Sequence, residues 1–173
     1  MRPFVVARTH TRRARAGSRR PADLSAAVYG QVLASSQVAA LSLDESLDSA
    51  AILLALTGTV LVFWLAHVYA RTVADRIQRH ASTRGDIVAA MRFEWPIVEA
   101  AVPAALALTL GIVGVLSTEN AVFLAISLGA VNLFVWGLAI GRRLNLGRAA
   151  MLALAFSNAL FGLIVILMKV AIH

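Results

Sequence analysis

The chain has 173 residues, of which 60% are hydrophobic and only 14% are charged, and its mean hydropathy is +0.78. Soluble domains carry about 25% charged residues, and a domain of this size cannot hide so much apolar surface from water, which excludes a soluble protein. The absence of cysteine excludes disulfides, thiolate metal sites and cysteine nucleophiles.

Apolar windows recur along the chain at the length of about 20 residues that crosses a bilayer as a helix. We expect transmembrane helices at about 24–43, 49–70, 97–118, 120–140 and 149–171. No linker, repeat or soluble domain separates them, so residues 23–173 are predicted to form a single membrane domain. Residues 1–22 are predicted to be a basic, disordered cytoplasmic tail. The expected fold class is an all-α polytopic membrane helix bundle with five transmembrane helices.

The window at 24–43 is more polar than the others, so hydropathy alone does not show whether it crosses the membrane. The distribution of charged residues along the chain decides this question. Seven arginines lie in 1–20, five in 71–95 and three in 141–148, whereas the connectors 44–48 and 117–120 hold four acids and no base. If 24–43 spans the membrane, all fifteen arginines lie on one side, which marks the cytoplasmic face. We therefore expect a cell-membrane protein with a cytoplasmic N-terminus and an outside C-terminus. Lys169 is the exception and can snorkel to the interface.

The N-terminal region also permits a second interpretation, in which residues 1–40 are a cleaved signal peptide. "SRRPADL" places twin arginines before an apolar stretch, and "VAA" at 38–40 could precede a cleavage site. Asp23 and two glutamines interrupt the apolar region and argue against it. Cleavage would leave four helices. The arginine-rich tail is expected to contact anionic lipid, and no nucleic-acid partner is predicted.

The first helix carries polar residues on one arc. At 100° per residue, Gln31, Ser35 and Ser42 lie close together on its surface. Such an arc cannot face lipid cheaply, so it must face other helices, another subunit or a water-filled path.

The connector between the second and third spans, "RTVADRIQRHASTRGDIVAAMRFEW", is expected to be partly helical. The second helix should continue into the cytoplasm and end near Gly85. Asp86 should then cap a short interfacial helix that leads through Trp95, in the aromatic belt, into Pro96 at the first turn of the next span.

Polar groups inside the predicted spans are the first candidates for a functional site, because they are costly in lipid. His67 lies four residues before Arg71, and Glu99 lies four residues after Trp95. Both should therefore lie about 6 Å inside the cytoplasmic boundary at 1.5 Å per residue. Thr59 continues the helical face of His67 towards the membrane centre.

We therefore predict a polar site formed by His67 and Glu99 near the cytoplasmic mouth. Pro103 leaves the carbonyl of Glu99 without its helical partner, and an imidazole titrates near neutrality, so the pair would suit a proton relay. The structural alternative is that Arg71, Arg92 or lipid headgroups satisfy Glu99 while His67 joins interfacial aromatic packing. Two ligands without a third do not specify a metal, so no metal site is predicted.

Asn132 and Asn158 lie near the middle of the last two spans and are expected to hydrogen-bond across helices, with a permeation pathway as the alternative. "GLAIG", with Gly137 and Gly141, matches the GxxxG pattern that lets helices approach closely. It favours packing or dimerisation.

"AVYGQVLASSQVAAL", "FWLAHVYAR" and "MRFEWPIVEAAVPA" together resemble small multi-pass actinobacterial-type integral membrane proteins of unassigned function. The resemblance covers roughly residues 25–140 and implies no activity or residue role. No catalytic motif is present, so neither an enzyme nor a cofactor is predicted. The leading hypothesis is a channel or transporter for protons or small ions, which could be a homo-oligomer. The alternative is a non-catalytic scaffold or accessory subunit that binds a membrane-protein partner.

The five-span topology predicts that protease added outside intact cells leaves residues 1–20 uncut, because the arginine-rich tail lies in the cytoplasm. Inside-out vesicles should expose the tail to the same protease. Digestion from the outside of intact cells would contradict five spans.

Overall fold

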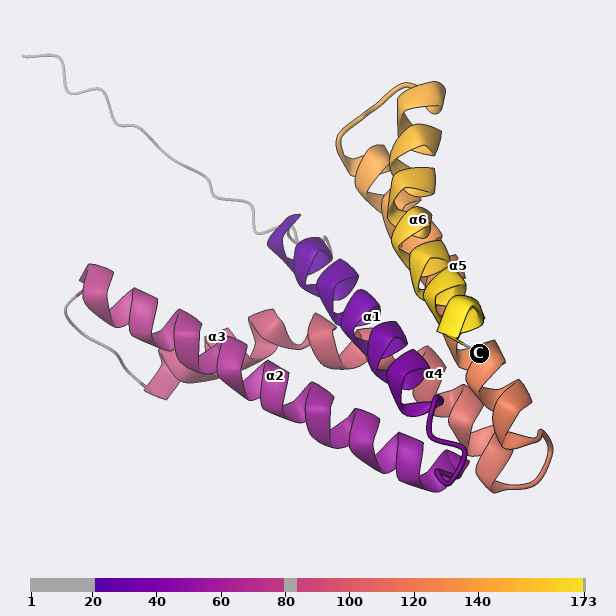
Figure 1. The fold of residues 1–173 in the computed structure, drawn as a ribbon. Coiled ribbons are helices and arrows are strands. Elements are labelled where there is room, and N and C mark those ends of the chain that lie inside the picture. The colour runs from indigo at the N-terminus through magenta and orange to yellow at the C-terminus, as the bar shows by residue number, and fades with distance from the viewer. Residues whose placement is uncertain (1–20, 80–83, 173) are drawn as a thin grey trace, which may run out of the picture.

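The computed structural model describes residues 21–79 and 84–172, and all regular structure in these two ranges is helical. This confirms the all-α class (Figure 1). The helices are α1 (Pro21–Leu41), α2 (Ser49–Arg79), α3 (Arg84–Glu94), α4 (Pro96–Ile112), α5 (Thr118–Arg143) and α6 (Arg148–Ile172).

Among the described residues, three helices are long and apolar enough to cross a membrane: α2 over Ser49–Ile77, α5 over Thr118–Arg143 and α6 over Arg148–Ala171. Helices α3 and α4 are bent by 40° at the break between them, and they count as a fourth span if the pair is taken together. The described chain therefore has the character of a membrane protein. The five-span arrangement, which needs α1 as a further span, stays a prediction.

The connector between α2 and α4 differs in detail from the expectation. Helix α2 ends at Arg79, short of Gly85, and α3 already begins at Arg84. Asp86 therefore lies inside the first turn of α3 and is not its capping residue, which corrects the sequence-based prediction. Its carboxylate remains well placed there, because the positive end of the helix dipole favours an acid in the first turn.

Helix α4 begins as expected, with Pro96 in its first turn, where the missing N–H costs no hydrogen bond. The proline ring cannot continue the helix from α3 without a bend. The helix ends at Ile112, six residues before the expected end of the third span, since Gly114 adopts φ 77° in the turn that follows. Ser117 then caps α5, and its hydroxyl accepts a hydrogen bond from the Asn120 backbone N–H at 3.3 Å.

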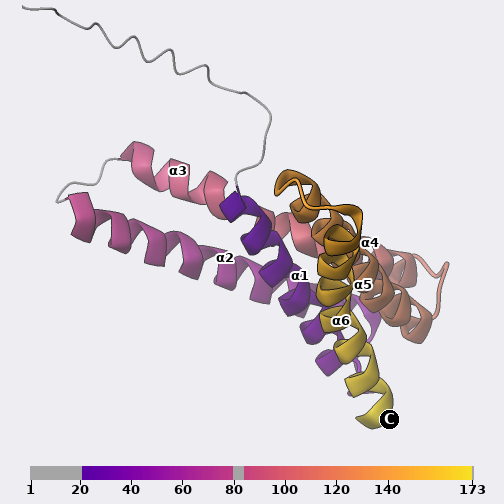
Figure 2. The same cartoon turned by 90° about the horizontal axis from the view of Figure 1, so that it is seen from above.

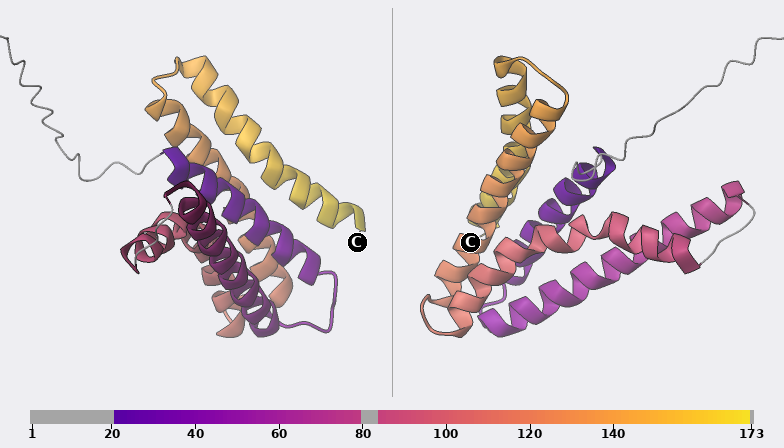
Figure 3. Two further views of the ribbon diagram at one scale, coloured as in Figure 1. Left: turned by 90° about the vertical axis from the view of Figure 1, so that its left-hand side faces the viewer. Right: turned by 180° about the vertical axis from the view of Figure 1, so that it is seen from behind.

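The helices form two hairpins that diverge from one end of the molecule. Helices α5 and α6 run side by side as one hairpin, and α2 with α3 forms the other, which points away from it (Figures 1 and 2). The α1–α2 and α4–α5 connectors lie at the end where the hairpins converge, and α1 lies between them (Figure 3). We call this the acidic end, because Asp44, Glu45 and Asp48 lie in the α1–α2 connector and Glu119 lies in the first turn of α5.

Helix α1 holds the hairpins together, because it alone among the described helices contacts all five others. A glycine makes one of these contacts close: a Cβ added at Gly30 would lie 2.9 Å from the Ile97 Cα of α4. The buried core beside α1 combines Val38 with larger residues such as Leu56 of α2 and Ile126 of α5.

Glycines also set the distance between α5 and α6. A Cβ added at Gly137 would lie 2.5 Å from the Cα of Ala155, and one added at Gly141 would meet the Met151 backbone at 3.0 Å. Gly162 repeats the arrangement from the α6 side, 2.6 Å from the Cα of Ala130. The "GLAIG" face is therefore occupied by α6 of the same chain.

Replacing Gly137 by Ala should lower the free energy of unfolding by about 1–3 kcal/mol, because the new methyl group meets backbone that cannot move aside. Gly58→Ala is the matched control, since a Cβ there meets nothing within 4 Å. The control should be neutral or stabilising by up to about 1 kcal/mol, because alanine is the better helix former. Denaturant titration in mild detergent measures both variants, and equal effects would contradict the close contact of α5 with α6.

Candidate functional site

Residues 28–35 of α1, which we call the central segment, bring together the candidate residues of the other helices. The segment contacts His67 of α2 and Asn132 of α5, and it lines a cavity beside Asn158 of α6. It also packs on the first turns of α4, the helix that carries Glu99.

In the middle of the central segment, Gln31 and Ser35 form a network of uncharged hydrogen-bonding side chains with Asn132 of α5. Asn132 donates from Nδ2 to Oε1 of Gln31 at 2.6 Å, and Gln31 donates from Nε2 to Oγ of Ser35 at 3.3 Å. Gln31 is fully buried and Ser35 is 1% exposed. Gly129 of α5 faces both side chains and leaves room for them. The expectation that this polar arc faces other helices is confirmed for Gln31 and Ser35.

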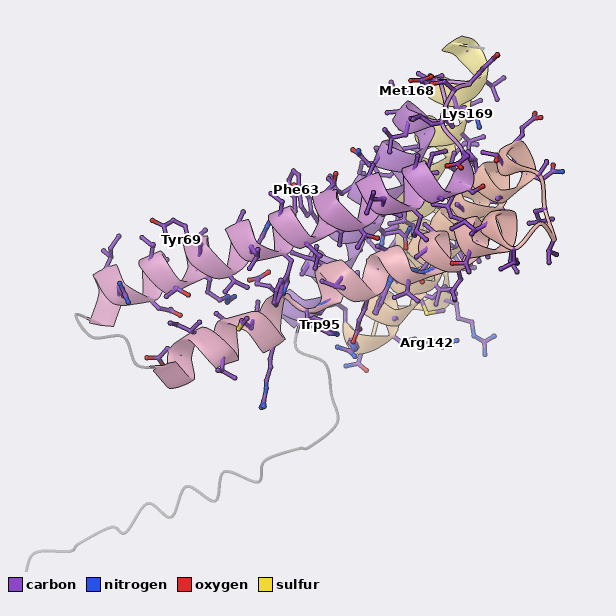
Figure 4. The ribbon with its side chains drawn as sticks, turned by 90° about the horizontal axis from the view of Figure 1, so that it is seen from below. Phe63, Tyr69, Trp95, Arg142, Met168 and Lys169 are labelled. Carbon is purple, nitrogen blue, oxygen red and sulfur yellow. The ribbon has the colours of Figure 1, made fainter. Side chains whose placement is uncertain are left out.

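His67 contacts Phe63 of its own helix and Tyr29 of α1. Its Nδ1 donates to the backbone carbonyl of Phe63 at 2.9 Å, and its ring lies 5.4 Å from the ring of Tyr29. Glu99 takes part in an interaction of its own, and its pairing with His67 stays a prediction. Thr59 lies partly buried two turns earlier on α2. Figure 4 labels Phe63 on this helix.

Asn158 lies beside a cavity of about 430 Å³ between α1, α5 and α6. Its amide nitrogen is buried and has no hydrogen-bond partner among the described residues. A buried amide donor is unfavourable without an acceptor, so a water molecule or a ligand oxygen would stabilise it. The remaining lining is mostly apolar: Val28, Tyr29, Val32, Ile140 and Phe161.

An ion pair that the sequence analysis missed fixes α3 to α2. Arg71 donates from Nε to Oε1 of Glu94 at 3.0 Å, and its guanidinium lies 3.4 Å from the centre of the Phe93 ring. Glu94 is only 7% exposed. Trp64 adds a hydrogen bond from Nε1 to the carbonyl of Met91 at 3.3 Å. Arg71 is therefore the ion-pair partner of Glu94, which lies directly before Trp95 and Pro96 in the sequence.

The acidic end holds a second cavity, of about 390 Å³, lined by Asp44, Glu45, Asp48 and Glu119 together with Lys169. The hydroxyl and backbone N–H of Ser46 both donate to Asp44 and hold the pKa of its carboxyl below the usual range. In the described part of the chain no group of three metal-ligating side chains is close enough to hold a metal ion.

No known protein family, curated protein or solved structure matches this chain. The functional argument therefore depends on the described contacts and cavities.

The hydrogen bond between Asn132 and Gln31 should contribute measurably to stability. Asn132→Leu leaves the Gln31 oxygen without a donor in an apolar interior, so the free energy of unfolding should fall by about 1–2 kcal/mol. Combining it with Gln31→Leu should cost less than the sum of the two single changes, because both partners are then removed.

Thr109→Val is the matched control, since Thr109 is exposed and its hydroxyl donates to the Ala105 carbonyl of its own helix at 2.8 Å. It should change stability by less than about 0.5 kcal/mol. The original protein, the Gln31→Leu and Asn132→Leu variants and the double variant are compared by denaturant titration. If the two single changes add up exactly in the double variant, the interhelical hydrogen bond is contradicted.

Proposed function

We propose that the protein is a small membrane transport protein that passes protons or small cations along α1. The observation that carries this proposal is that polar groups of α1 meet polar or titratable groups of other helices at successive levels. Tyr29 meets His67, Gln31 meets Asn132, and Ser42 borders the cavity at the acidic end. A helix that only faced lipid would carry none of these groups.

The charge of the acidic end supports a cation as the solute. Four carboxylates and one ammonium line the cavity there, so its net charge is negative when the acids are ionised. A hollow lined by one sign of charge raises the local concentration of the opposite ion, and rings of Asp and Glu are used in this way by cation channels.

Nearer the N-terminal end of α1, the ring of His67 lies 5.4 Å from the ring of Tyr29. An imidazole has one ring nitrogen that can donate a hydrogen bond and one that can accept one, which suits the transfer of protons. The arginine distribution supports five spans, with this end on the cytoplasmic side of the cell membrane and the acidic end outside.

A specific observation also favours a second candidate, a non-catalytic scaffold or accessory subunit. Gln31, Ser35 and Asn132 hydrogen-bond to one another, so these polar groups already have a structural role. The α2–α3 hairpin stands away from α5 and α6 and presents Ile77 and Val88, which are 72% and 47% exposed, to a partner (Figure 1).

The transport proposal predicts cation flux from purified protein in liposomes above that of empty liposomes, under proton, potassium and sodium gradients. Glu119→Gln removes one charge from the cavity and should lower the flux about two- to fivefold at low ionic strength. The effect should vanish near 1 M salt, where the screening length is about 3 Å. His67→Ala should lower proton flux in particular.

Asp75→Asn is the matched control for Glu119→Gln, because it removes the same charge from α2 away from the cavity. It should leave the flux unchanged. No flux above empty liposomes in any of these gradients, for the original protein and the variants alike, would rule out transport. Co-purification with one fixed membrane protein would then support the scaffold.

A further inference from the structure

Lys169 of α6 reaches the acidic end of the molecule, where it lines the cavity of about 390 Å³ together with Asp44, Glu45, Asp48 and Glu119 (Figure 4). It is the only lysine in the chain, and the other fifteen of the 16 basic residues are arginines. Glu119 attracts its ammonium group electrostatically. The cavity that the transport proposal uses to attract cations therefore already contains a cation of the protein itself.

The ammonium group of Lys169 borders this cavity without being fixed by a short ion pair. In the described part of the chain, no carboxylate lies within the 4 Å that define an ion pair with it. Lys169 also borders a mostly apolar cavity beside Val165 and Met168, which suits the methylene groups of its side chain. Lysine carries a compact charge on a flexible four-carbon stem, whereas arginine presents a rigid fork that favours one pairing. A lysine is therefore suited to stay in the cavity and still give way to another cation.

The cavity acts on cations through its net charge and not through a preformed set of ligands. In residues 21–79 and 84–172, no group of three metal-ligating side chains is close enough to hold a metal ion. Four carboxylates and one ammonium line the cavity, which gives a net charge of −3 when all are ionised and of −4 if the ammonium is removed. A transport path must attract a cation strongly enough for entry and weakly enough for release.

We propose that Lys169 is a built-in counter-cation of the acidic cavity, which weakens the hold of the carboxylates on the solute cation and disfavours divalent cations most. This inference rests on the proposed cation transport. A unit charge about 8 Å away in water changes the local concentration of a monovalent ion roughly two- to threefold. A divalent ion feels twice the energy, so its local concentration changes by the square of that factor, roughly four- to ninefold.

Thiol modification measures the electrostatic potential in the cavity without any flux, so a failure of this inference can be told apart from a failure of transport. The chain has no cysteine, and Ser42→Cys places a single thiol at the wall of the cavity. A cationic and an anionic methanethiosulfonate reagent of similar size are compared on the full chain in mild detergent at low ionic strength. Adding Lys169→Gln should raise the ratio of the cationic to the anionic rate about four- to ninefold, because the two reagents differ by two charges. The rise should disappear near 1 M salt, where the screening length is about 3 Å.

Lys169→Arg keeps the positive charge and should leave the ratio of the two rates unchanged. Arg142→Gln removes a positive charge from the end of α5 opposite to Glu119, and it should also leave the ratio unchanged. A ratio that does not rise in Lys169→Gln would overturn the proposal. An equal rise in Lys169→Arg would overturn it too, because packing of the side chain and not its charge would then control access to the thiol.

Protection of the same thiol by added cations tests the discrimination against divalent ions. At constant ionic strength, Mg²⁺ or Na⁺ that enters the cavity should slow the cationic reagent. Lys169→Gln should lower the Mg²⁺ concentration that halves the rate about four- to ninefold, and the corresponding Na⁺ concentration only about two- to threefold. Equal shifts for the two ions, or no protection by either, would contradict a counter-cation that disfavours divalent ions.

Discussion

The structure depends on the requirement that polar side chains inside an apolar bundle find partners within the protein. Helix α1 contributes Gln31 and Ser35 to the buried interior, where no water replaces a missing hydrogen bond. The hydrogen bond from Asn132 supplies a partner for Gln31 and also fixes how α5 lies against α1. Polar partners, and not only apolar contact, therefore determine the position of the helix that touches all the others.

Small residues also position the helices, because they let neighbouring backbones approach closely. Lipid tails are as apolar as leucine, so helices in a bundle gain from close packing more than from burial. Gly30, Gly129 and Gly137 lie where α1 meets α4, where α1 meets α5 and where α5 meets α6. Helices α2 and α3 are held together differently, by the partly buried ion pair of Arg71 with Glu94.

The sequence predicts the helices well and their partners poorly, for a physical reason. Hydropathy depends on neighbouring residues, so it predicts where the apolar helices lie, and Pro96 itself predicts the first turn of α4. The pairing of Gln31 with Asn132 joins residues 101 positions apart and follows from helix rotation. For the same reason the sequence offers Arg71 only as one of several groups that could satisfy Glu99, whereas the structure pairs Arg71 with Glu94.

The distance along the chain between these two amides has a consequence for how the protein is made. Ribosomes add about 5–20 residues per second, so Gln31 emerges about 5–20 s before Asn132, which lies 101 residues later. During that interval Gln31 of α1 lacks the Asn132 side chain that completes its hydrogen bonds. Helix α1 therefore reaches its final environment only after α5 has been made, although it precedes the other described helices in the chain.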